Sequence, residues 1–431
     1  MNGTSDMRIL FLTAHLPFPP ASGGRRREFE LLSRLGKKFE VHLCSLTTDL
    51  QIDTENAKEL QGFCQSVSLF KAQEIPQNKY ACRYPWLMRR YYSDQAIIQI
   101  SQMLAEKKFD IVHVEGYYLM QLVRCNSGVH ILLVEHNMEY TLNLQRMLLS
   151  PSLVEAQFYW QEYYYTLYWE RYFWRRATKI IAITTDDEAS IRRLEPDVDV
   201  ILIPNGTDHD FGVEKSNRQK MSSDCILLDS SLDQVVRQDI PSILFVGNFL
   251  YYPNIDAALY FCNNIFPLIL KKIHDARLFI VGNSPTPQIQ ALATHSNNNI
   301  VVTGFVSSLF PFYKTAKVVV CPLRIGGGIK VKILEALRAG KAIVSTSVGA
   351  QGLDINNQLL CIADKTPDFA NYVIRFLSNP EERLHQEQSA SQFAKTMSTW
   401  NQVKEEYIRC YAEMCSDTDS KKSKLLAQKK L

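Results

Sequence analysis

The feature that most constrains this chain is a regular alternation of short apolar runs with longer stretches of helical periodicity. Such alternation is the signature of βαβ units, in which a helix returns the chain to the start of the next parallel strand. In the first half we expect strands at 8–13, 40–46, 66–70, 110–114, 130–134, 179–184 and 199–203. In the second half we expect them at 242–247, 277–282, 300–304, 317–323 and 342–346. The sequence therefore predicts an α/β protein with two doubly wound, Rossmann-like domains.

The predicted elements divide the 431 residues into five parts. A chain of this length exceeds the usual size of one hydrophobic core, which agrees with more than one domain. A polar stretch rich in Ser and Asp, without sustained periodicity, separates the two halves and is typical of a linker or insertion. We expect an N-terminal domain at 1–213, this linker at 214–239, a C-terminal domain at 240–380, terminal helices at 381–415 and a disordered basic tail at 416–431.

Composition excludes several classes of protein. The net charge of +3 gives no general basic excess of the kind that nucleic-acid binding requires, so we expect no nucleic-acid partner. The ten cysteines are scattered without a CxxC pair, which favours reduced thiols and no metal site. The N-terminus lacks the pattern of a signal peptide, and no run of about 18 apolar residues predicts a membrane span. These features together predict a cytoplasmic protein.

Glycines follow several predicted strands of the second domain. Gly247, Gly282 and Gly304 each end a strand, and Gly326–Gly328 form a loop after another. Ligands of open parallel sheets bind beyond the carboxyl ends of the strands, where glycine allows a close approach of the backbone. A single glycine after a strand is also common in ordinary turns. Only the occurrence of several such glycines at one edge of the sheet indicates a site. GxGxxG after a strand and GxxxxGK[ST] are both missing, which disfavours a dinucleotide fold and a P-loop.

The segment 324–346 carries an unusual set of charges after the glycine loop. Arg324, Lys330 and Lys332 lie near a predicted helix start, where unpaired backbone N–H groups and the helix dipole are already positive. An anion such as a diphosphate would explain them without a metal ion. Glu335 sits among apolar residues, and a pair of ribose hydroxyls would suit its carboxylate. The alternative is that the lysines are solvated and that Glu335 pairs with one of them at the surface.

Two segments of the first domain could carry chemistry. Gly23 and Gly24 lie between a strand and a helix that opens with Arg25, Arg26 and Arg27, so exposed N–H groups and cations could meet an anion. The alternative is a plain loop with arginines in water. His136 directly follows a predicted strand, at the edge where ligands of such sheets bind, although a single histidine can equally be structural.

The segment 157–176 contains eleven aromatic residues. It could form a membrane-facing helix or a platform for a sugar or a lipid-linked substrate. The alternative is a long helix packed across the first domain, because aromatic stripes are mostly core. Interspersed charges argue against full burial in a bilayer. A peripheral contact with the inner face of the membrane stays open.

Six motifs together resemble the retaining nucleotide-sugar glycosyltransferases of group 1, family four, which have the GT-B fold. The motifs are ASGGRRREFELLSRL (21–35), EHNMEY (135–140), LIPNGTD (202–208), FVGNFLYYPNIDA (245–257), VTGFVSSLFPFY (302–313) and CPLRIGGGIKVKILEALRAGKAIVSTSVGAQGL (321–353). They span both predicted domains in the family's order and are most like sugar transferases of bacterial exopolysaccharide clusters. The resemblance implies two domains facing across a cleft, with the terminal helices crossing back to the first domain.

The resemblance also implies roles for individual residues. In the second domain Glu335 would bind the ribose, Val306 would lie near the base, and Gly327, Gly328 and Ile329 would hold the diphosphate. Gly247 and Asn248 would also line the donor site. In the first domain Gly23 and Gly24 would meet the diphosphate or the acceptor, Arg27 would contact the acceptor, and His136 would lie beside the donor sugar.

Two departures from the family pattern concern the donor's sugar and phosphates. Many members have a glutamate eight residues before the ribose-binding one, and that position is Gly327 here. Many also have a glycine–arginine pair followed by a lysine after the first strand of the second domain, where this chain has Asn248 and Asn254. We hypothesise that Lys330 or Lys332, with Arg324, replaces the missing cations, since positive charge at a leaving diphosphate lowers the barrier by several kcal/mol, on the order of 3 per donor.

The expected reaction moves a sugar from a nucleoside diphosphate to a hydroxyl of a glycan or lipid-linked acceptor, with retention and without a cofactor. Retention implies attack on the face from which the nucleotide departs, with the diphosphate itself able to accept the proton. One alternative is a sugar-nucleotide epimerase on the same fold, which would need carboxylates in the cleft. Another is a catalytically impaired relative that binds a sugar or a partner.

Overall fold

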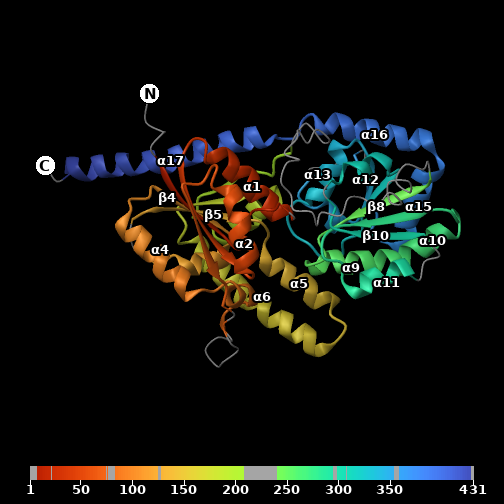
Figure 1. Cartoon of the computed structure of the whole chain (residues 1–431), viewed down its shortest axis with the longest axis horizontal. Helices are drawn as coiled ribbons and strands as arrows, with labels where there is room; N and C mark the ends of the chain where they lie inside the picture. The colour runs from red at the N-terminus through yellow and green to blue at the C-terminus, as the bar shows by residue number, and fades with distance from the viewer. Residues whose placement is uncertain are drawn as a thin grey trace. The chain divides into compact units, whose positions relative to one another are not determined.

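The computed structural model describes residues 7–20, 22–73, 75, 83–124, 128–207, 240–294, 299–306, 308–353 and 359–428 (Figure 1). The chain forms two compact units. Unit 1 comprises the chain up to Gly206 together with the segment from Trp400 onward. Unit 2 runs from Thr207 to Thr399. The chain therefore leaves unit 1 once and returns to it near its end.

Unit 1 is built on a seven-stranded parallel sheet. Its strands are β1 (Arg8–Thr13), β2 (Glu40–Thr47), β3 (Ser66–Lys71), β4 (Ile111–Glu115), β5 (His130–Glu135), β6 (Lys179–Ala182) and β7 (Val200–Leu202). They lie in the order β3-β2-β1-β4-β5-β6-β7. The order reverses between β1 and β4, and this reversal is the topological switch point at which open α/β sheets bind ligands.

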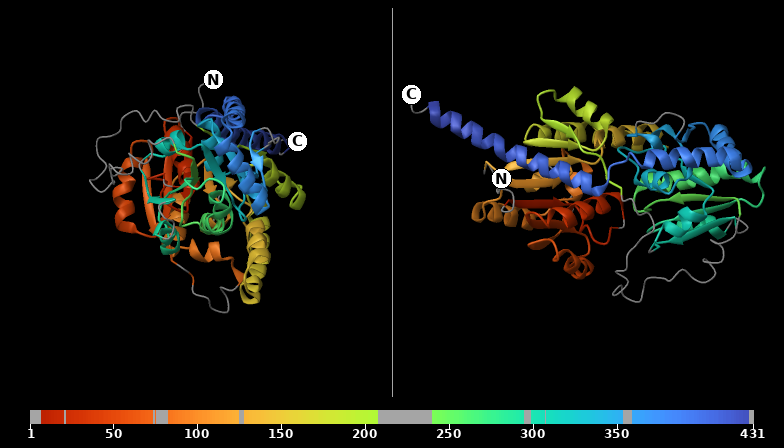
Figure 2. Two further views of the ribbon diagram at one scale, coloured as in Figure 1. Left: turned by 90° about the vertical axis from the view of Figure 1, so that its right-hand side faces the viewer. Right: turned by 90° about the horizontal axis from the view of Figure 1, so that it is seen from above.

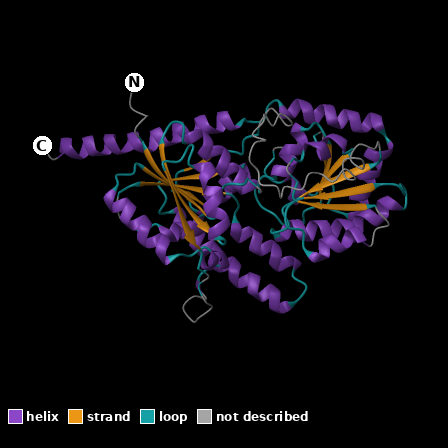
Figure 3. Cartoon of the chain, viewed as in Figure 1, coloured by secondary structure: helices purple, strands orange, loops and turns teal. Residues whose placement is uncertain are grey.

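Helices cover both faces of this sheet (Figure 3). They are α1 (Gly23–Leu35), α2 (Leu50–Ala57), α3 (Trp86–Arg90), α4 (Asp94–Glu106), α5 (Glu139–Leu149), α6 (Leu153–Trp174), α7 (Thr185–Leu194) and α17 (Trp400–Gln428), with the 3-10 helices η1 (Lys58–Leu60) and η3 (Tyr117–Leu122). In Figure 2, α17 is the long blue helix that runs along unit 1 and extends past its sheet. Val403, Tyr407 and Tyr411 of α17 are buried in the same cluster as Leu31 and Leu35 of α1.

Unit 2 repeats the architecture with six parallel strands, β8 (Ser242–Val246), β9 (Arg277–Val281), β10 (Ile300–Gly304), β11 (Val318–Cys321), β12 (Ala342–Ser345) and β13 (Cys361–Ile362). Their order is β10-β9-β8-β11-β12-β13, with the switch point between β8 and β11. The helices are α9 (Tyr252–Tyr260), α10 (Phe266–Leu270), α11 (Pro287–Thr294), α12 (Phe310–Thr315), α13 (Val331–Arg338), α14 (Ser347–Ala350), α15 (Thr366–Ser378) and α16 (Pro380–Ala394), and a π-helical segment, η4 (Phe261–Ile265), joins α9 to α10.

The apolar runs form strands because both faces of each sheet are covered. In β1, Leu10 and Leu12 pack into one cluster of buried residues, whereas Ile9 and Phe11 pack into the cluster on the other face. A strand buried on both faces needs continuous apolar sequence rather than alternation, which is why the runs could be recognised. The predicted α/β class with two doubly wound units is confirmed, and each predicted strand coincides with an observed one.

Three features differ from the expectations or fall outside them. The short strand β13 was not expected, because two residues give too little pattern to recognise. The predicted linker at 214–239 lies outside the described residues. The backbone of 416–428 continues α17, in the part of the chain where we expected a disordered tail. This segment contains no Gly or Pro and several good helix formers, which allows the helix to continue.

The terminal helices belong to different units. Helix α16 packs in unit 2, and α17 belongs to unit 1, so the return to the first unit begins at Trp400. Among the described residues, no helix combines the length and apolarity needed to cross a bilayer.

Candidate active site

Unit 1 contains a cavity of about 170 Å³ at its switch point. The lining residues come from the segments that follow β1, β4 and β5 and from the start of α1: Ala14, His15, Ser22, Gly24, Arg25, Glu28, Gly116, Tyr118, Glu135, His136, Asn137 and Glu139. The carboxyl ends of parallel strands meet at one edge, and this common edge is what brings residues from such distant parts of the sequence together. Of the residues that the sequence singled out as site residues, Gly24 and His136 line this cavity.

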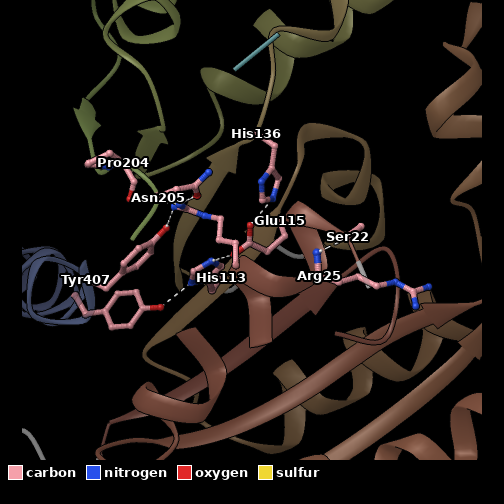
Figure 4. A network of polar contacts seen from close by, with 10 residues as sticks. Ser22, Arg25, His113, Glu115, His136, Pro204, Asn205 and Tyr407 are labelled. Atoms are coloured by element: carbon pink, nitrogen blue, oxygen red, sulfur yellow. Dashed lines mark hydrogen bonds and ion pairs between the residues drawn. The ribbon is translucent and has the colours of Figure 1, made fainter. Parts of the chain in front are cut away.

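A chain of polar contacts connects the cavity to the interior of unit 1 (Figure 4). Nε2 of His136 lies 2.6 Å from Oε2 of Glu115. The other oxygen of Glu115 lies 2.8 Å from Nε2 of His113, whose Nδ1 lies 2.6 Å from the hydroxyl of Tyr411 on α17. His113 and Glu115 are completely buried, so they hold the half-buried His136 in one orientation.

Glu115 is ionised in this arrangement. Burial alone would raise the pKa of Glu115, but the positive charge of His136 and the hydrogen bonds from His113 and His136 hold this pKa well below its usual range. His113 behaves differently, because burial lowers its pKa despite the neighbouring carboxylate. A fixed negative charge therefore lies directly behind His136.

Glu28 brings a second buried carboxyl group to the same place. Its Oε2 has no hydrogen-bond partner among the described residues, and its side chain lines the cavity from α1. Burial raises the pKa of Glu28 well above its usual value, and the charge of Glu115 raises it further. Two adjacent carboxyl groups with pKa values shifted in opposite directions form an acid–base pair.

The side chains of Glu28, Glu115 and His136 also have the chemistry of a metal site. Their ligand atoms all lie within 4.8 Å of one another. However, two ligands that each lie about 2.0–2.2 Å from a zinc ion in tetrahedral geometry are more than about 3 Å apart. The 2.6 Å between Nε2 of His136 and Oε2 of Glu115 is instead the separation of a direct contact between the two side chains.

Further acidic side chains line the cavity or lie next to it. Trp174 donates from Nε1 to Oε1 of Glu135 at 2.7 Å. Burial raises the pKa of Glu135 to about 8, although this hydrogen bond partly opposes the shift. Burial likewise raises the pKa of Glu139 and, with the charges of Glu135 and Glu139, that of Glu170. The wall of the cavity after β5 therefore carries two carboxyl groups, Glu135 and Glu139, whose pKa values are raised by burial.

The start of α1 faces the cavity through its backbone. Helix α1 begins at Gly23, and the hydroxyl of its N-cap Ser22 accepts a hydrogen bond from the N–H of Arg25 at 3.4 Å. A Cβ atom added to Gly24 would meet nothing within 4 Å, so the space above this residue is open. Arg25 also lines the cavity. A helix N-terminus and a cation thus face the same space as His136.

Arg27 does not line the cavity. Its guanidinium is 1% exposed and donates to Oδ1 of Asn205 at 2.5 Å and to the hydroxyl of Tyr407 at 2.6 Å. Its Cζ atom also lies 5.8 Å from the ring centre of Tyr407. These contacts attach α17 to the end of the unit 1 sheet. They favour a structural role over the direct acceptor contact expected from the sequence.

In unit 2 the corresponding edge lies after β8 and β11. Gly247 and Asn248 follow β8, and the loop Gly326–Gly328 precedes α13. Gly282, after β9, has a φ of +152°, and a Cβ atom there would lie only 1.7 Å from the carbonyl oxygen of Gly247. The two backbones can approach only because Gly282 has no side chain.

The two lysines of α13 have different surroundings. Lys330 is buried and donates to the carbonyl oxygens of Gly327 and Gly328 at 2.8 and 2.7 Å, so it stabilises its own loop. Gly328 has a φ of +61°, which favours glycine there. Lys332 donates to Oδ1 of Asn254 at 2.7 Å, and its ammonium lies 4.7 Å from the ring centre of Phe245. Burial lowers the pKa of Lys332.

Lys332 is thus held at the switch point, because α9 with Asn254 follows β8 and α13 follows β11. Asn254 donates in turn to the carbonyl oxygen of Asn248 at 2.9 Å. Arg324 is exposed and forms an ion pair with Asp256, and its guanidinium stacks 4.7 Å over the ring of Tyr260. Lys332 therefore meets the geometric requirement for a diphosphate cation better than Lys330 or Arg324.

Glu335 lies one turn further along α13. The hydroxyl of the buried Tyr313 donates to its Oε2 at 3.1 Å. Glu335 is half-buried, as are Ile329 and Val306, and Val306 packs against the core of unit 2. Lys332, Glu335 and the glycine loop thus occur together on the edge that the sequence indicated.

Two family models match the chain. The model described as "Glycosyltransferase Family 4" matches residues 21–211, and "Glycosyl transferases group 1" matches residues 240–379. The chain belongs to these glycosyltransferases. The matches cover both units, and the family expected from the six motifs is confirmed.

Known proteins similar to this glycosyltransferase agree with the fold. An uncharacterized 44.6 kDa protein in the cps region of Klebsiella pneumoniae is 22% identical over 388 residues, 86% of this chain and 91% of that protein. Sucrose-phosphate synthase from Thermosynechococcus elongatus has a TM-score of 0.71 at 16% identity, covering 95% of this chain and all of that one (100%). Anabaena HepE in complex with UDP and glucose has a TM-score of 0.64 at 12% identity, covering 94% and 100%. These structures share the GT-B fold.

The sequence did not single out several residues that line or support the site of the glycosyltransferase. Glu115 ends the run IVHVE just before Gly116. Like His136, it is a polar residue at the end of a predicted strand, so the sequence could have indicated it. Glu28 lies on α1 immediately after Arg27 and has the appearance of an ordinary helix carboxylate. Tyr313 gives no signal, because its contact with Glu335 depends on how α12 packs against α13.

Proposed function

We propose that this glycosyltransferase moves a sugar from a nucleoside diphosphate donor to a hydroxyl of a glycan or lipid-linked acceptor, with retention of configuration and without a metal ion. The observation that carries the proposal is the position of Lys332. A half-buried ammonium at the switch point of unit 2, next to a glycine loop and one turn from Glu335, suits a diphosphate joined to a ribose.

Each part of the donor has a matching group in unit 2. Lys332 would neutralise the diphosphate, and the N–H groups of the loop at Gly327, Gly328 and Ile329 would bind its oxygens. Glu335, oriented by Tyr313, would accept hydrogen bonds from the ribose hydroxyls. Val306 would border the base, and Gly247 and Asn248 would border the donor after β8.

The chemistry would use the groups of unit 1. The acceptor oxygen attacks the anomeric carbon while the bond to the diphosphate breaks, and the departing diphosphate takes the acceptor's proton. His136, held by Glu115, would hydrogen-bond the sugar, and Gly23 and Gly24 would meet the diphosphate or acceptor through their N–H groups. Lys332 would stabilise the charge that develops on the leaving diphosphate, so no metal ion is needed for that task.

The acceptor and the place of action are also part of the proposal. The similar Klebsiella protein comes from a capsule region, which supports a role in building a surface polysaccharide. We infer that the enzyme works in the cytoplasm, at the inner face of the membrane, where a lipid-linked acceptor would lie. The complexes of Anabaena HepE with UDP and with UDP-glucose support a uridine nucleotide as the first donor to test.

One observation favours keeping a second candidate function. A sugar-nucleotide epimerase needs carboxyl groups at the sugar for elimination and re-addition, and Glu28 and Glu115 line or adjoin the unit 1 cavity. An epimerase would convert one sugar nucleotide into its isomer, whereas a transferase in the absence of acceptor would slowly release free sugar and nucleoside diphosphate.

A thermal-shift panel of UDP, GDP, TDP and CDP tests donor binding, because a ligand of the native state raises its melting temperature. We expect one nucleotide to raise the melting temperature of the wild type and of His136→Ala but not of Lys332→Ala. Mass detection of products from the matching nucleotide sugars should then show free sugar with the wild type and a large loss with His136→Ala. No shift with any nucleotide would contradict the proposal, and an isomerised sugar nucleotide would favour the epimerase.

A further inference from the structure

The paired helices α5 and α6 of unit 1 carry an unusual share of exposed apolar side chains. They are joined by Ser150, Pro151 and Ser152 and run side by side (Figure 1). Of the 20 large hydrophobic side chains that are exposed in the described residues, ten lie on this pair or its turn: Leu144, Leu148, Leu149, Leu153, Val154, Phe158, Trp160, Tyr164, Tyr168 and Tyr172. Contiguous apolar surface of this extent marks an interaction site.

The exposed side chains change in type along the helix pair, from aliphatic at the turn to aromatic along α6. At the turn, Leu148, Leu149, Leu153 and Val154 form an aliphatic tip whose members are between 43% and 90% exposed. Along α6, Trp160, Tyr164, Tyr168 and Tyr172 follow at intervals of four residues and form an aromatic row, between 36% and 62% exposed. At about 100° per residue, Leu153, Val154 and the whole aromatic row fall within roughly one third of the helix circumference.

The polar side chains of α6 are distributed in the reverse of the usual pattern. Glu162 and Glu170 face the interior, where Glu162 accepts from the N–H of Trp86 at 2.7 Å and Glu170 accepts from the N–H of Glu139 at 2.8 Å. Helices on a water-facing surface turn their acids outward and their rings inward. Here two carboxylates of α6 are buried, and the four rings of the aromatic row are exposed.

The charges left near the surface are mostly positive. Arg175 and Arg176 are exposed at the end of α6. Arg175 forms an ion pair with Glu195, whereas the guanidinium of Arg176 lies 5.4 Å from the ring centre of Tyr172. On α5, Arg146 lies 5.7 Å from the ring centre of Tyr159. Glu155 is the acid near the tip that is not buried. An apolar arc bordered by arginines complements a layer of acyl chains beneath anionic headgroups.

We infer that α5 and α6 dock unit 1 onto a phospholipid bilayer. The aliphatic tip enters the acyl region, the aromatic row lies at the headgroup level, and the arginines face the lipid phosphates. Tyr and Trp suit this level because each combines an apolar ring with a polar tip. This inference rests on the proposed function, because docking would keep the enzyme at the surface where a lipid-linked acceptor lies.

Flotation of the full chain with vesicles of phosphatidylethanolamine and phosphatidylglycerol tests this inference. We expect the wild type to float with the vesicles and Leu153→Asp/Val154→Asp to lose at least about tenfold in partitioning, because two charges would enter the apolar layer. Ile98→Asp is the matched control, since Ile98 is an exposed aliphatic residue on α4 of the same unit, and it should float like the wild type. A dye on Leu153→Cys should shift to the blue on vesicles.

Several results would overturn the inference. Failure of the wild type to float, or equal flotation of the double variant, would exclude docking through the tip. Self-association in lipid-free buffer that the double variant abolishes would show that a second copy covers this surface. Donor hydrolysis in lipid-free buffer is measured alongside, and its retention in the double variant separates failure of membrane docking from failure of the proposed transferase activity.

Discussion

The ammonium nitrogen of Lys332 lies 2.7 Å from Oδ1 of Asn254. Asn254 occupies the position at which many members of the family have a lysine that binds phosphate. We propose that Lys332, which reaches Asn254 from α13, supplies the cation that α9 lacks. In this proposal the departure from the family pattern is a relocation of charge between two helices that meet at the switch point of unit 2.

This relocation predicts that the charge can be moved back. We expect Lys332→Ala to weaken binding of the nucleoside diphosphate by about 30-fold, because a buried charge-assisted contact is lost. Adding Asn254→Lys to Lys332→Ala should restore affinity to within about fivefold of the wild type, since an ammonium returns to the same space. Isothermal titration of the four proteins in this cycle measures the effect.

The control for this cycle is Lys330→Ala. Lys330 donates to the carbonyl oxygens of its own loop, so its loss should lower the melting temperature of the ligand-free protein, and Asn254→Lys should not rescue it. Affinity that is unchanged in Lys332→Ala would show that the ammonium does not contact the diphosphate.

The hydrogen bond from Tyr313 to Glu335 predicts how the ribose is recognised. Removing the hydroxyl in Tyr313→Phe should weaken nucleotide binding by about threefold to fivefold, because Glu335 loses a hydrogen bond that orients it. Glu335→Ala should weaken it by about tenfold or more. The deciding measurement is the affinity for a nucleotide without the 2′ and 3′ hydroxyls, which should be equal for the wild type and Glu335→Ala. A preference for the ribose that survives in Glu335→Ala would assign the hydroxyls to another group.

The sequence predicted the scaffold well because each strand is buried on both faces and so appears as a continuous apolar run. It also indicated residues that stand at strand ends, such as His136, since the edge of a parallel sheet is fixed by chain order alone. It could not indicate that Tyr313 contacts Glu335 or that Glu115 holds two histidines, because such contacts depend on how separate elements pack. It also could not indicate that Glu162 and Glu170 of α6 are buried, because acidic side chains on a surface helix usually face water.

Glu115 should act as a positioning residue for His136. We expect Glu115→Gln to lower kcat by about 100-fold with little change in the KM of the donor, because the imidazole loses its charged partner while the donor site lies in unit 2. His136→Ala should lower kcat by a similar factor. The double variant should be no slower than the slower single variant, since both changes remove the same interaction. Additive losses would show that the two residues act independently.

Arg27 should affect stability more than acceptor binding. Arg27→Ala leaves Tyr407 and Asn205 without their buried donor, so we expect the free energy of unfolding to fall by about 3 kcal/mol. Arg409→Ala, at an exposed position on α17, should change it by less than about 0.5 kcal/mol. Denaturant unfolding measures both. An Arg27→Ala protein of normal stability with a raised KM for the acceptor would restore the direct contact expected from the sequence.

Glu135 predicts a specific dependence of stability on pH. Its pKa is raised from 4.5 to about 8 by burial, so the folded protein keeps a proton that the unfolded chain releases. Between these two values folding takes up a proton, and the free energy of unfolding therefore falls as pH rises, by up to about 1.4 kcal/mol per pH unit. Glu135→Gln can still accept from Trp174 but carries no titrating group.

The measurement is the difference in the free energy of unfolding between Glu135→Gln and the wild type at several pH values from about 5 to about 8. Glu28 and His113 titrate in both proteins and largely cancel in this difference. The difference should shift in favour of the variant as pH rises, whereas Glu106→Gln, at an exposed position at the end of α4, should give a flat line. A flat line for Glu135→Gln would mean that water or a counter-charge reaches the carboxylate, and the wall of the cavity after β5 would then be ionised during catalysis.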